Sequence, residues 1–152
     1  MPFTDSLAVE AIDLNLNADS GATALETLVQ LATDAHGLPD PHLIVSALIE
    51  REELSTTGIG GGIAVPHCKT PQAGKLVMAV GISKEGIEFQ ALDHNPVHLF
   101  FLLLAPIEAA NSHLKALAKI ARFAKDPKMM QQLLALDSQQ EVFDFLVQLT
   151  KG

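Results

Sequence analysis

The sequence predicts an α/β domain with three layers, in which a central mixed parallel and antiparallel sheet is flanked by helices. Helical segments come first along the chain, apolar strands follow, and further helices end it. Residues 97–104 are almost continuously apolar, which is typical of a central strand covered on both faces. With 152 residues, of which 48% are hydrophobic, the chain can bury a core, and we assign residues 1–152 to a single domain.

The first third of the chain predicts one strand and two helices. Residues 12–16 alternate apolar and polar side chains, as a short strand does. Residues 20–37 begin with a serine that can cap a helix and end with a glycine that can close it. Residues 40–54 open with Asp-Pro, a common helix start, and are apolar on nearly all sides until the last turn, which contains Arg51.

The middle of the chain predicts a loop followed by strands. Four glycines within residues 58–62 break the helical period and predict a loop. Runs rich in apolar and β-branched residues predict strands over residues 63–65, 75–83 and 97–104. Three more helices are predicted, and they begin near residues 111–112, at residue 126 and at residue 138.

The charge of the chain is uneven. The net charge is −8, and the first 50 residues hold eight acids and no Lys or Arg, whereas the remainder holds ten of each sign. Nucleic acid and anionic membranes are therefore poor partners. A basic protein would be attracted if these acids lie on a docking face. The alternative is that they serve solubility alone.

Several features favour the cytoplasm. Cys68 is the only cysteine, so the domain holds no internal disulfide. The first basic residue is Arg51, so the start of the chain lacks the positive charge of a signal peptide. The longest dense apolar run, residues 99–105, is too short to span a bilayer.

His67 is the first candidate for chemistry. It follows Pro66, whose fixed φ and missing N–H predict that the strand ends there and presents the ring of His67, where open sheets often bind ligands. The glycines of residues 58–62 would let the backbone of another molecule come close. These glycines lack the third glycine of the dinucleotide pattern and the Lys-Ser/Thr of a P-loop, so a nucleotide site is disfavoured. A purely structural histidine is the alternative.

A metal site is also disfavoured. His67 with Cys68, and His94 with His98, could supply four ligands, but the chain has neither two separated cysteine pairs nor a histidine pair on a helix. We therefore expect no metal and no cofactor. His36 flanks a turn between helices and is interpreted as a solvated loop histidine, as is His42.

Residues 58–67, Gly-Ile-Gly-Gly-Gly-Ile-Ala-Val-Pro-His, resemble a known signature. It is the phosphorylation site of the fructose/mannitol-type enzyme IIA domains of the bacterial phosphoenolpyruvate-dependent phosphotransferase system, including their nitrogen-regulatory branch. The lead-in of residues 49–57, the strand and proline of residues 95–106 and the histidine-led helix start at residues 113–120 also resemble this family. The resemblance covers residues from about 12 to 148 in order.

The resemblance implies a phosphocarrier with a phosphohistidine intermediate. His67 would accept a phosphoryl group from the histidine-containing phosphocarrier protein and pass it to the cysteine of an enzyme IIB domain. The alternative is a regulatory protein whose phosphorylation state controls binding to a kinase, channel or transcription factor. Either protein would be peripheral to a membrane permease at most. The same motif residues occur in both branches, so they do not separate the two functions.

The resemblance also implies roles for two further residues. Arg51 would bind the phosphoryl group, because its fork of donors suits phosphate oxygens. The alternative is a surface ion pair with Glu52, Glu53 or another acid. His113 would hydrogen-bond the phosphoryl group or orient the ring of His67, and the alternative is a histidine near a helix cap without a chemical role.

Cys68 departs from the pattern of the family, which commonly has glycine or another very small residue after the histidine. If this position needs a positive φ, Cys68 is strained by about 1–2 kcal/mol. We interpret Cys68 as a tolerated small residue and not as a nucleophile, since nothing near it in the sequence marks an acidic thiol.

Overall fold

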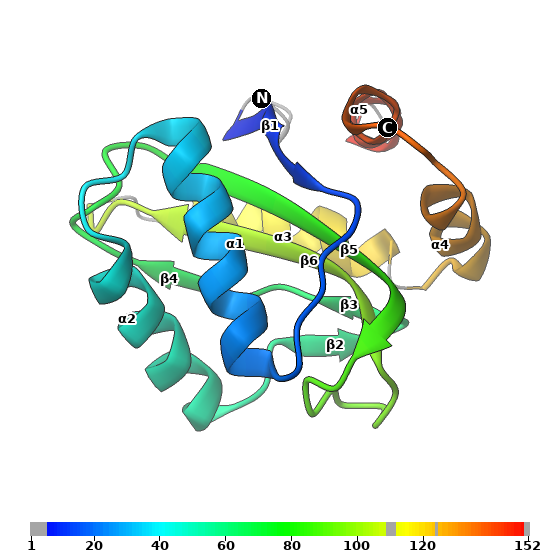
Figure 1. Cartoon of the computed structure of the whole chain (residues 1–152), viewed down its shortest axis with the longest axis horizontal. Helices are drawn as coiled ribbons and strands as arrows, with labels where there is room; N and C mark the ends of the chain where they lie inside the picture. The colour runs from blue at the N-terminus through cyan, green and yellow to red at the C-terminus, as the bar shows by residue number, and fades with distance from the viewer. Residues whose placement is uncertain (1–5, 109–111, 124, 151–152) are drawn as a thin grey trace.

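The computed structural model describes residues 6–108, 112–123 and 125–150 (Figure 1). The described residues form a six-stranded mixed sheet with helices on both faces. Helices α1 (Gly21–His36) and α2 (Pro41–Leu54) pack together on one face, and α3 (Ser112–Phe123) contacts the other. The predicted three-layer α/β class is confirmed.

The helices match their predicted positions. After α3 come α4 (Pro127–Leu134) and α5 (Gln139–Thr150), and α5 contacts the first strand. The Ser20 hydroxyl accepts the backbone N–H of Thr23 at the start of α1, and Gly37 ends this helix with a φ of 71°. Local capping therefore determines where α1 begins and ends.

The sheet has two antiparallel and three parallel pairings. Its strands are β1 (Leu7–Asp13), β2 (Gly58–Gly60), β3 (Ile63–Ala64), β4 (His67–Lys69), β5 (Val77–Ile87) and β6 (Val97–Ala105). The order is β1-β5-β6-β3-β2, and β4 also pairs with β6. The β5–β6 and β2–β3 pairs are antiparallel, whereas β1 runs parallel to β5, and β3 and β4 run parallel to β6.

The first strand is not where the sequence predicted it. The strand expected over residues 12–16 instead covers Leu7–Asp13, and the chain turns directly after it. The N–H of Leu16 donates to the carbonyl of Ile82, so this residue lies beside β5 without continuing the strand. The alternation over residues 12–16 includes a buried residue that follows the turn, Leu16, and not a continuous pleated segment.

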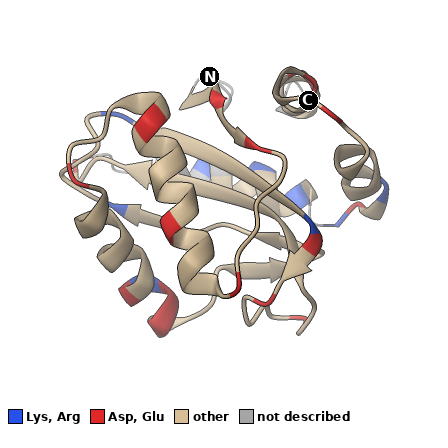
Figure 2. Cartoon of the chain, in the orientation of Figure 1, with Lys and Arg blue, Asp and Glu red and all other residues tan. Residues whose placement is uncertain are grey.

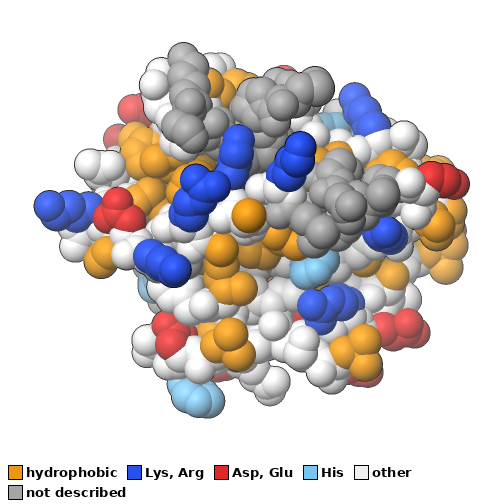
Figure 3. Space-filling view, turned by 180° about the vertical axis from the view of Figure 1, so that it is seen from behind, with side chains coloured by type: hydrophobic (Ala, Val, Ile, Leu, Met, Phe, Trp, Pro, Cys, Tyr) orange, Lys and Arg blue, Asp and Glu red, His pale blue; other side chains and the backbone are white. Residues whose placement is uncertain are grey.

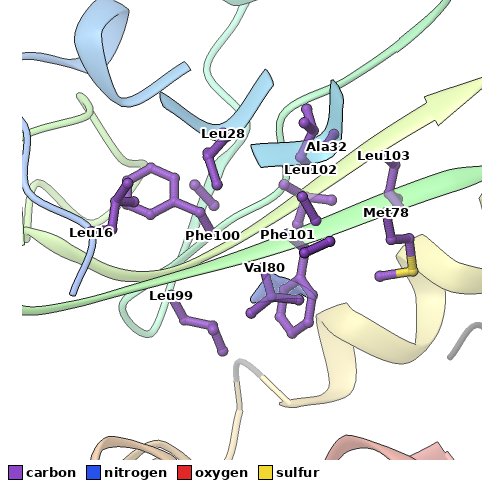
Figure 4. Close-up of a cluster of buried hydrophobic side chains, with 14 of the residues drawn as sticks. Leu16, Leu28, Ala32, Met78, Val80, Leu99, Phe100, Phe101, Leu102 and Leu103 are labelled. Carbon is purple, nitrogen blue, oxygen red and sulfur yellow. The ribbon is translucent and has the colours of Figure 1, made fainter. Parts of the chain in front are cut away.

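Side chains of β6 alternate between the two helical layers. Gly81 pairs with Phe100, and a Cβ at Gly81 would lie 2.8 Å from Leu16 and 2.9 Å from Leu28, so this face meets α1. Figure 4 shows Phe100 beside Leu28 and Phe101 on the α3 side of the sheet. Even-numbered β6 residues therefore face α1, and odd-numbered residues face α3. In the part of the chain that is described, no helix has the length and apolar character needed to cross a membrane.

Candidate functional site

The chain does not leave the sheet at Pro66. Ile63 pairs with Leu99 and His67 pairs with Leu103, so β3 and β4 follow β6 in one unbroken register. Pro66 only interrupts the strand, and its carbonyl accepts the N–H of Leu103 at 2.9 Å. The prediction that the strand ends at Pro66 is wrong, because β6 holds both segments. His67 is the first residue of the resumed strand.

His67 lies just beyond the part of the chain that pairs with the β2 segment. The last bond of that pairing is donated by the N–H of Val65 to the carbonyl of Thr57, just before β2, at 2.9 Å. On either side of β4, the carbonyl of Pro66 and the N–H of Thr70 bond to β6, so the backbone groups of His67 point away from β6. Helix α2 packs against β4. Since His67 pairs with Leu103, an odd-numbered residue of β6, its side chain lies on the α3 side of the sheet.

The ring of His67 is oriented by its own backbone. Nδ1 lies 2.7 Å from the carbonyl oxygen of Val65, and the side chain is half-buried. A carbonyl only accepts hydrogen bonds, so Nδ1 carries the proton and donates it. In the neutral ring the lone pair is then on Nε2. In this tautomer Nε2 is the ring nitrogen that could act as a nucleophile.

The glycines upstream build the hairpin between β2 and β3. Gly60, Gly61 and Gly62 have φ values of 95°, 66° and 81°, a conformation that favours glycine. The N–H of Gly61 donates to Asp93 at 3.1 Å. A Cβ at Gly58 would lie 2.8 Å from the Cα of Ala91. The glycine turn is at the opposite end of β3 from His67, so the expectation that these glycines open the approach to His67 is wrong.

Arg51 is tied to the end of its own helix. In the described structure its Nη1 donates to the carbonyl of Ser55 at 3.1 Å and to its hydroxyl at 3.3 Å. The carboxylate of Glu52, a predicted ion-pair partner of Arg51, instead accepts the N–H and the hydroxyl of Thr57. No described contact brings Arg51 to His67. The guanidinium instead satisfies a carbonyl that the end of α2 leaves without a helical partner.

His113 is the second residue of α3, and its side chain lies outside the described residues. What the structure describes is the helix that carries it. This helix contacts β6, the strand that pairs with β4 and hence with His67. His113 and His67 therefore belong to the same side of the sheet.

Cys68 is unstrained. It lies in β4 opposite Leu104, and within the described ranges the non-glycine residues with positive φ are Gln90 and His94. Burial raises the pKa of the Cys68 thiol to about 11, so it is protonated at neutral pH. The structure therefore agrees with a tolerated small residue rather than a nucleophile.

Two of the other histidines have hydrogen-bond partners of their own. His98 Nδ1 lies 2.8 Å from the carbonyl of Ser83, whereas His94 is exposed. His36, predicted to be solvated, is half-buried at the end of α1, and its Nε2 lies 3.3 Å from the carbonyl of Met78. Burial lowers the pKa of His36. Among the described residues, no three His, Cys, Asp or Glu side chains are grouped so that they could hold a metal ion.

Comparison with known proteins assigns the family. Residues 5–148 match the model of the phosphoenolpyruvate-dependent sugar phosphotransferase system, EIIA 2. The chain belongs to this EIIA family. Members of the family are components of the phosphotransferase system, and the resemblance predicted from the glycine-proline-histidine motif is confirmed.

Relatives carry both sugar-specific and nitrogen-regulatory names. A nitrogen regulatory protein of Bradyrhizobium diazoefficiens is 38% identical over 96% of this chain and 95% of its own. A fructose-specific EIIA component of Haloferax volcanii is 35% identical over 99% of this chain and 100% of its own. A fructose-specific EIIABC component of Bacillus subtilis is 33% identical over 97% of this chain, which corresponds to 23% of that protein's length.

Solved structures share the fold. The nitrogen regulatory protein IIA-Ntr of Neisseria meningitidis has a TM-score of 0.86 and 28% identity, and the match covers 95% of this chain and 98% of the other. Another neighbour is the complex of enzyme IIA mannitol and phosphorylated enzyme IIB mannitol from Escherichia coli. Its TM-score is 0.76 at 24% identity, over 93% of this chain and 97% of the other. This neighbour is an example of the fold in a complex with an enzyme IIB.

Proposed function

We propose that the chain is a phosphocarrier that accepts a phosphoryl group on His67 from the histidine-containing phosphocarrier protein and passes it to the cysteine of an enzyme IIB domain. The observation that carries the proposal is the hydrogen bond from Nδ1 of His67 to the carbonyl of Val65. This bond holds the ring in the tautomer that a nitrogen nucleophile needs. We expect the reaction to take place in the cytoplasm.

The proposed transfer needs little from the protein beyond orientation and charge stabilisation. The lone pair of Nε2 attacks phosphorus in line, an N–P bond forms, and the N–P bond of the donor breaks, with its electron pair returning to the donor's imidazole. Positive charge develops on the ring of His67 as Nε2 bonds to phosphorus. The carbonyl of Val65, 2.7 Å from Nδ1, stabilises that charge. In the second step the thiolate of enzyme IIB takes the phosphoryl group, and the pair returns to Nε2.

The phosphorylated atom is expected to be Nε2 rather than Nδ1, because Nδ1 donates to Val65 within the same short segment. The chain, labelled with ¹⁵N in its histidines, is phosphorylated with phosphoenolpyruvate, enzyme I and the phosphocarrier protein, and ³¹P–¹⁵N couplings are recorded. A coupling to Nε2 of His67 is the expected result. A coupling to Nδ1 would mean that the bond to Val65 breaks during transfer and does not orient the nucleophile.

Arg51 and His113 are proposed to contact the phosphoryl group. For Arg51 this requires that the guanidinium leave Ser55, to which it is bonded in the structure. We expect Arg51→Gln to slow transfer in both directions by about ten- to hundredfold, which corresponds to the loss of about 1.5–3 kcal/mol for a charge-assisted hydrogen bond. Forward and reverse rates by rapid quench are the measurement.

The matched control for Arg51→Gln is Ser55→Ala, which removes the hydroxyl partner and leaves the guanidinium in place. Ser55→Ala should transfer at the wild-type rate. If Arg51→Gln also transfers at the wild-type rate, and only the free energy of unfolding falls, then Arg51 is a helix-capping residue and has no part in the reaction.

A regulatory function is the second candidate. It is favoured by the 38% identity to the Bradyrhizobium nitrogen regulatory protein and by the TM-score of 0.86 to IIA-Ntr. In this case the phosphoryl group on His67 changes the binding of a kinase, channel or transcription factor. The two functions are separated by adding the enzyme IIB proteins of the same genome to the phosphorylated chain. Loss of label to a IIB cysteine supports transport, and retention with all of them supports regulation.

A further inference from the structure

Hydrogen bonds connect the last turn of α2 to the ring of His67. In that turn, Glu52 accepts the backbone N–H of Thr57 on Oε2, at 3.0 Å, and the hydroxyl of Thr57 on Oε1. The carbonyl of Thr57 accepts the N–H of Val65 at 2.9 Å. The carbonyl of Val65 in turn lies 2.7 Å from Nδ1 of His67. Glu52 is thus connected to the candidate nucleophile through Thr57 and Val65.

The carbonyl of Val65 depends on its neighbours for its orientation. The carbonyl of Pro66 bonds to β6, and successive residues of a strand point their backbone groups to opposite sides, so those of Val65 point away from β6. The peptide group between Val65 and Pro66 has no N–H, so no donor of its own can fix it. The bond from the N–H of Val65 to Thr57 therefore helps to orient the carbonyl that receives Nδ1.

Thr57 is held in turn by the carboxylate of Glu52. It is 4% exposed and lies in the short connection between α2 and β2. Figure 2 shows acidic residues at the end of α2, where this connection begins. Hydrogen bonds to a carboxylate are stronger than those between neutral groups, and here one carboxylate takes both donors of a buried residue. A shift of Glu52 would therefore move Thr57, and with it the acceptor of the Val65 N–H.

We propose that Glu52 is a positioning residue for phosphoryl transfer, which holds Thr57 so that the carbonyl of Val65 stays in place for Nδ1 of His67. The inference rests on the proposed function and adds Glu52 and Thr57 to the residues on which transfer depends. A neutral imidazole carries its proton on either nitrogen, and in water the side chain prefers to carry it on Nε2. A proton on Nε2 removes the lone pair that attacks phosphorus. Loss of the bonds between Glu52 and Thr57 should therefore lower the fraction of molecules that are ready to react.

The test removes each side of this pair and includes a conservative variant of each. Glu52→Ala removes both acceptors, and Thr57→Val removes the hydroxyl but keeps the shape of the side chain. In Glu52→Gln the amide oxygen can still accept the N–H of Thr57, and in Thr57→Ser the hydroxyl remains. The conservative variants also serve if the larger changes prevent folding.

The alternative to positioning is a direct effect of the charge of Glu52 on the ring. Figure 3 shows both basic and acidic side chains over the α3 side of the molecule, the side that the ring of His67 faces. One exposed acid contributes little to such a field at physiological salt. Glu53→Gln is the matched control, because it removes the same charge from the neighbouring residue, whose side chain is exposed.

The first readout is the tautomer of His67 in the unphosphorylated chain. The histidines are labelled with ¹⁵N, and ring nitrogen shifts, which distinguish a protonated nitrogen from a bare one, are recorded at a pH at which the ring is neutral. Wild type, Thr57→Ser and Glu53→Gln should carry the proton on Nδ1. Glu52→Ala should show a population with the proton on Nε2, and Thr57→Val a smaller one. A variant that only loses stability keeps the wild-type shifts below its unfolding temperature, so such shifts in folded Glu52→Ala would overturn the proposal.

The second readout is the rate of transfer from the phosphorylated carrier protein. Glu52→Ala should lower kcat by about ten- to hundredfold, because misplacing a reacting group by about 1 Å can cost this much. Its KM should stay within about twofold of wild type, since the change affects the ring and not uniform binding of the donor. Glu52→Gln should lose less, and Glu53→Gln should transfer at the wild-type rate. A wild-type kcat in Glu52→Ala, or an equal loss in Glu53→Gln, would contradict positioning by Glu52.

The two readouts separate this inference from the function on which it rests. If the wild-type chain takes no label on His67 from the carrier protein, the proposed function fails, and a role of Glu52 in transfer fails with it. If the wild-type chain is labelled while Glu52→Ala keeps the wild-type tautomer and kcat, the positioning role alone is wrong.

Discussion

His67→Ala is expected to abolish phosphorylation of the chain completely. The other candidate nucleophiles are unsuited to replace it. Nε2 of His36 faces the carbonyl of Met78 at 3.3 Å, and Nε2 of His98 lies beside Gly86, where an added Cβ would be 3.3 Å away. Burial raises the pKa of the Cys68 thiol to about 11, so the thiolate is scarce at neutral pH. The measurement is the gain of one acid-labile phosphoryl group by mass spectrometry, after incubation with phosphoenolpyruvate, enzyme I and the phosphocarrier protein.

The control for this experiment is His42→Ala, which removes an exposed histidine from the first turn of α2. It should be phosphorylated to the wild-type extent and at the wild-type rate. Both variants should unfold at temperatures close to that of the wild type, because neither side chain is buried in the core. Full modification of His67→Ala would move the acceptor to another residue and would remove the basis of the proposed function.

The helices could be predicted because their signals are local. Ser20 caps α1 through the N–H of Thr23, and Gly37 ends it with a positive φ, as their residue types indicate. Strand positions depend on partners that are distant in sequence. The segment at Leu7–Asp13 is a strand because β5 pairs with it and α5 contacts it, and its own pattern does not alternate.

The candidate nucleophile could be predicted from the sequence, but the geometry around its ring could not. Pro66 correctly marks an interruption, yet the return of the chain to the sheet at His67 depends on β6 lying alongside. That return brings Nδ1 to the carbonyl of Val65 and turns the ring to the α3 side. The sequence predicts that the glycines serve the approach of a partner, whereas their φ values and the contact with Ala91 show that they shape the β2–β3 hairpin.

The largest loss of stability is expected for Phe100→Ala. Phe100 is fully buried on the α1 face of β6, and its ring meets that of Phe89 in a T-shaped contact with centroids 5.3 Å apart. Deleting a buried phenyl ring removes its transfer free energy and leaves a cavity, which lowers the free energy of unfolding by about 3–5 kcal/mol. Loss of the aromatic contact is part of this change. Urea unfolding followed by circular dichroism is the measurement.

Phe100→Ala is expected to lower the free energy of unfolding without changing phosphoryl transfer. The side chain of Phe100 points to α1, whereas His67 lies on the α3 side, so phosphoryl transfer per folded molecule should stay within about twofold of wild type below the unfolding transition. Phe100→Leu is the control, since it keeps much of the apolar volume and should recover a large part of the lost stability. A decrease of less than about 1 kcal/mol in Phe100→Ala would contradict the burial of this ring between β6 and α1. A large loss of transfer in the folded fraction would instead show that the two faces of β6 are coupled at the level of His67.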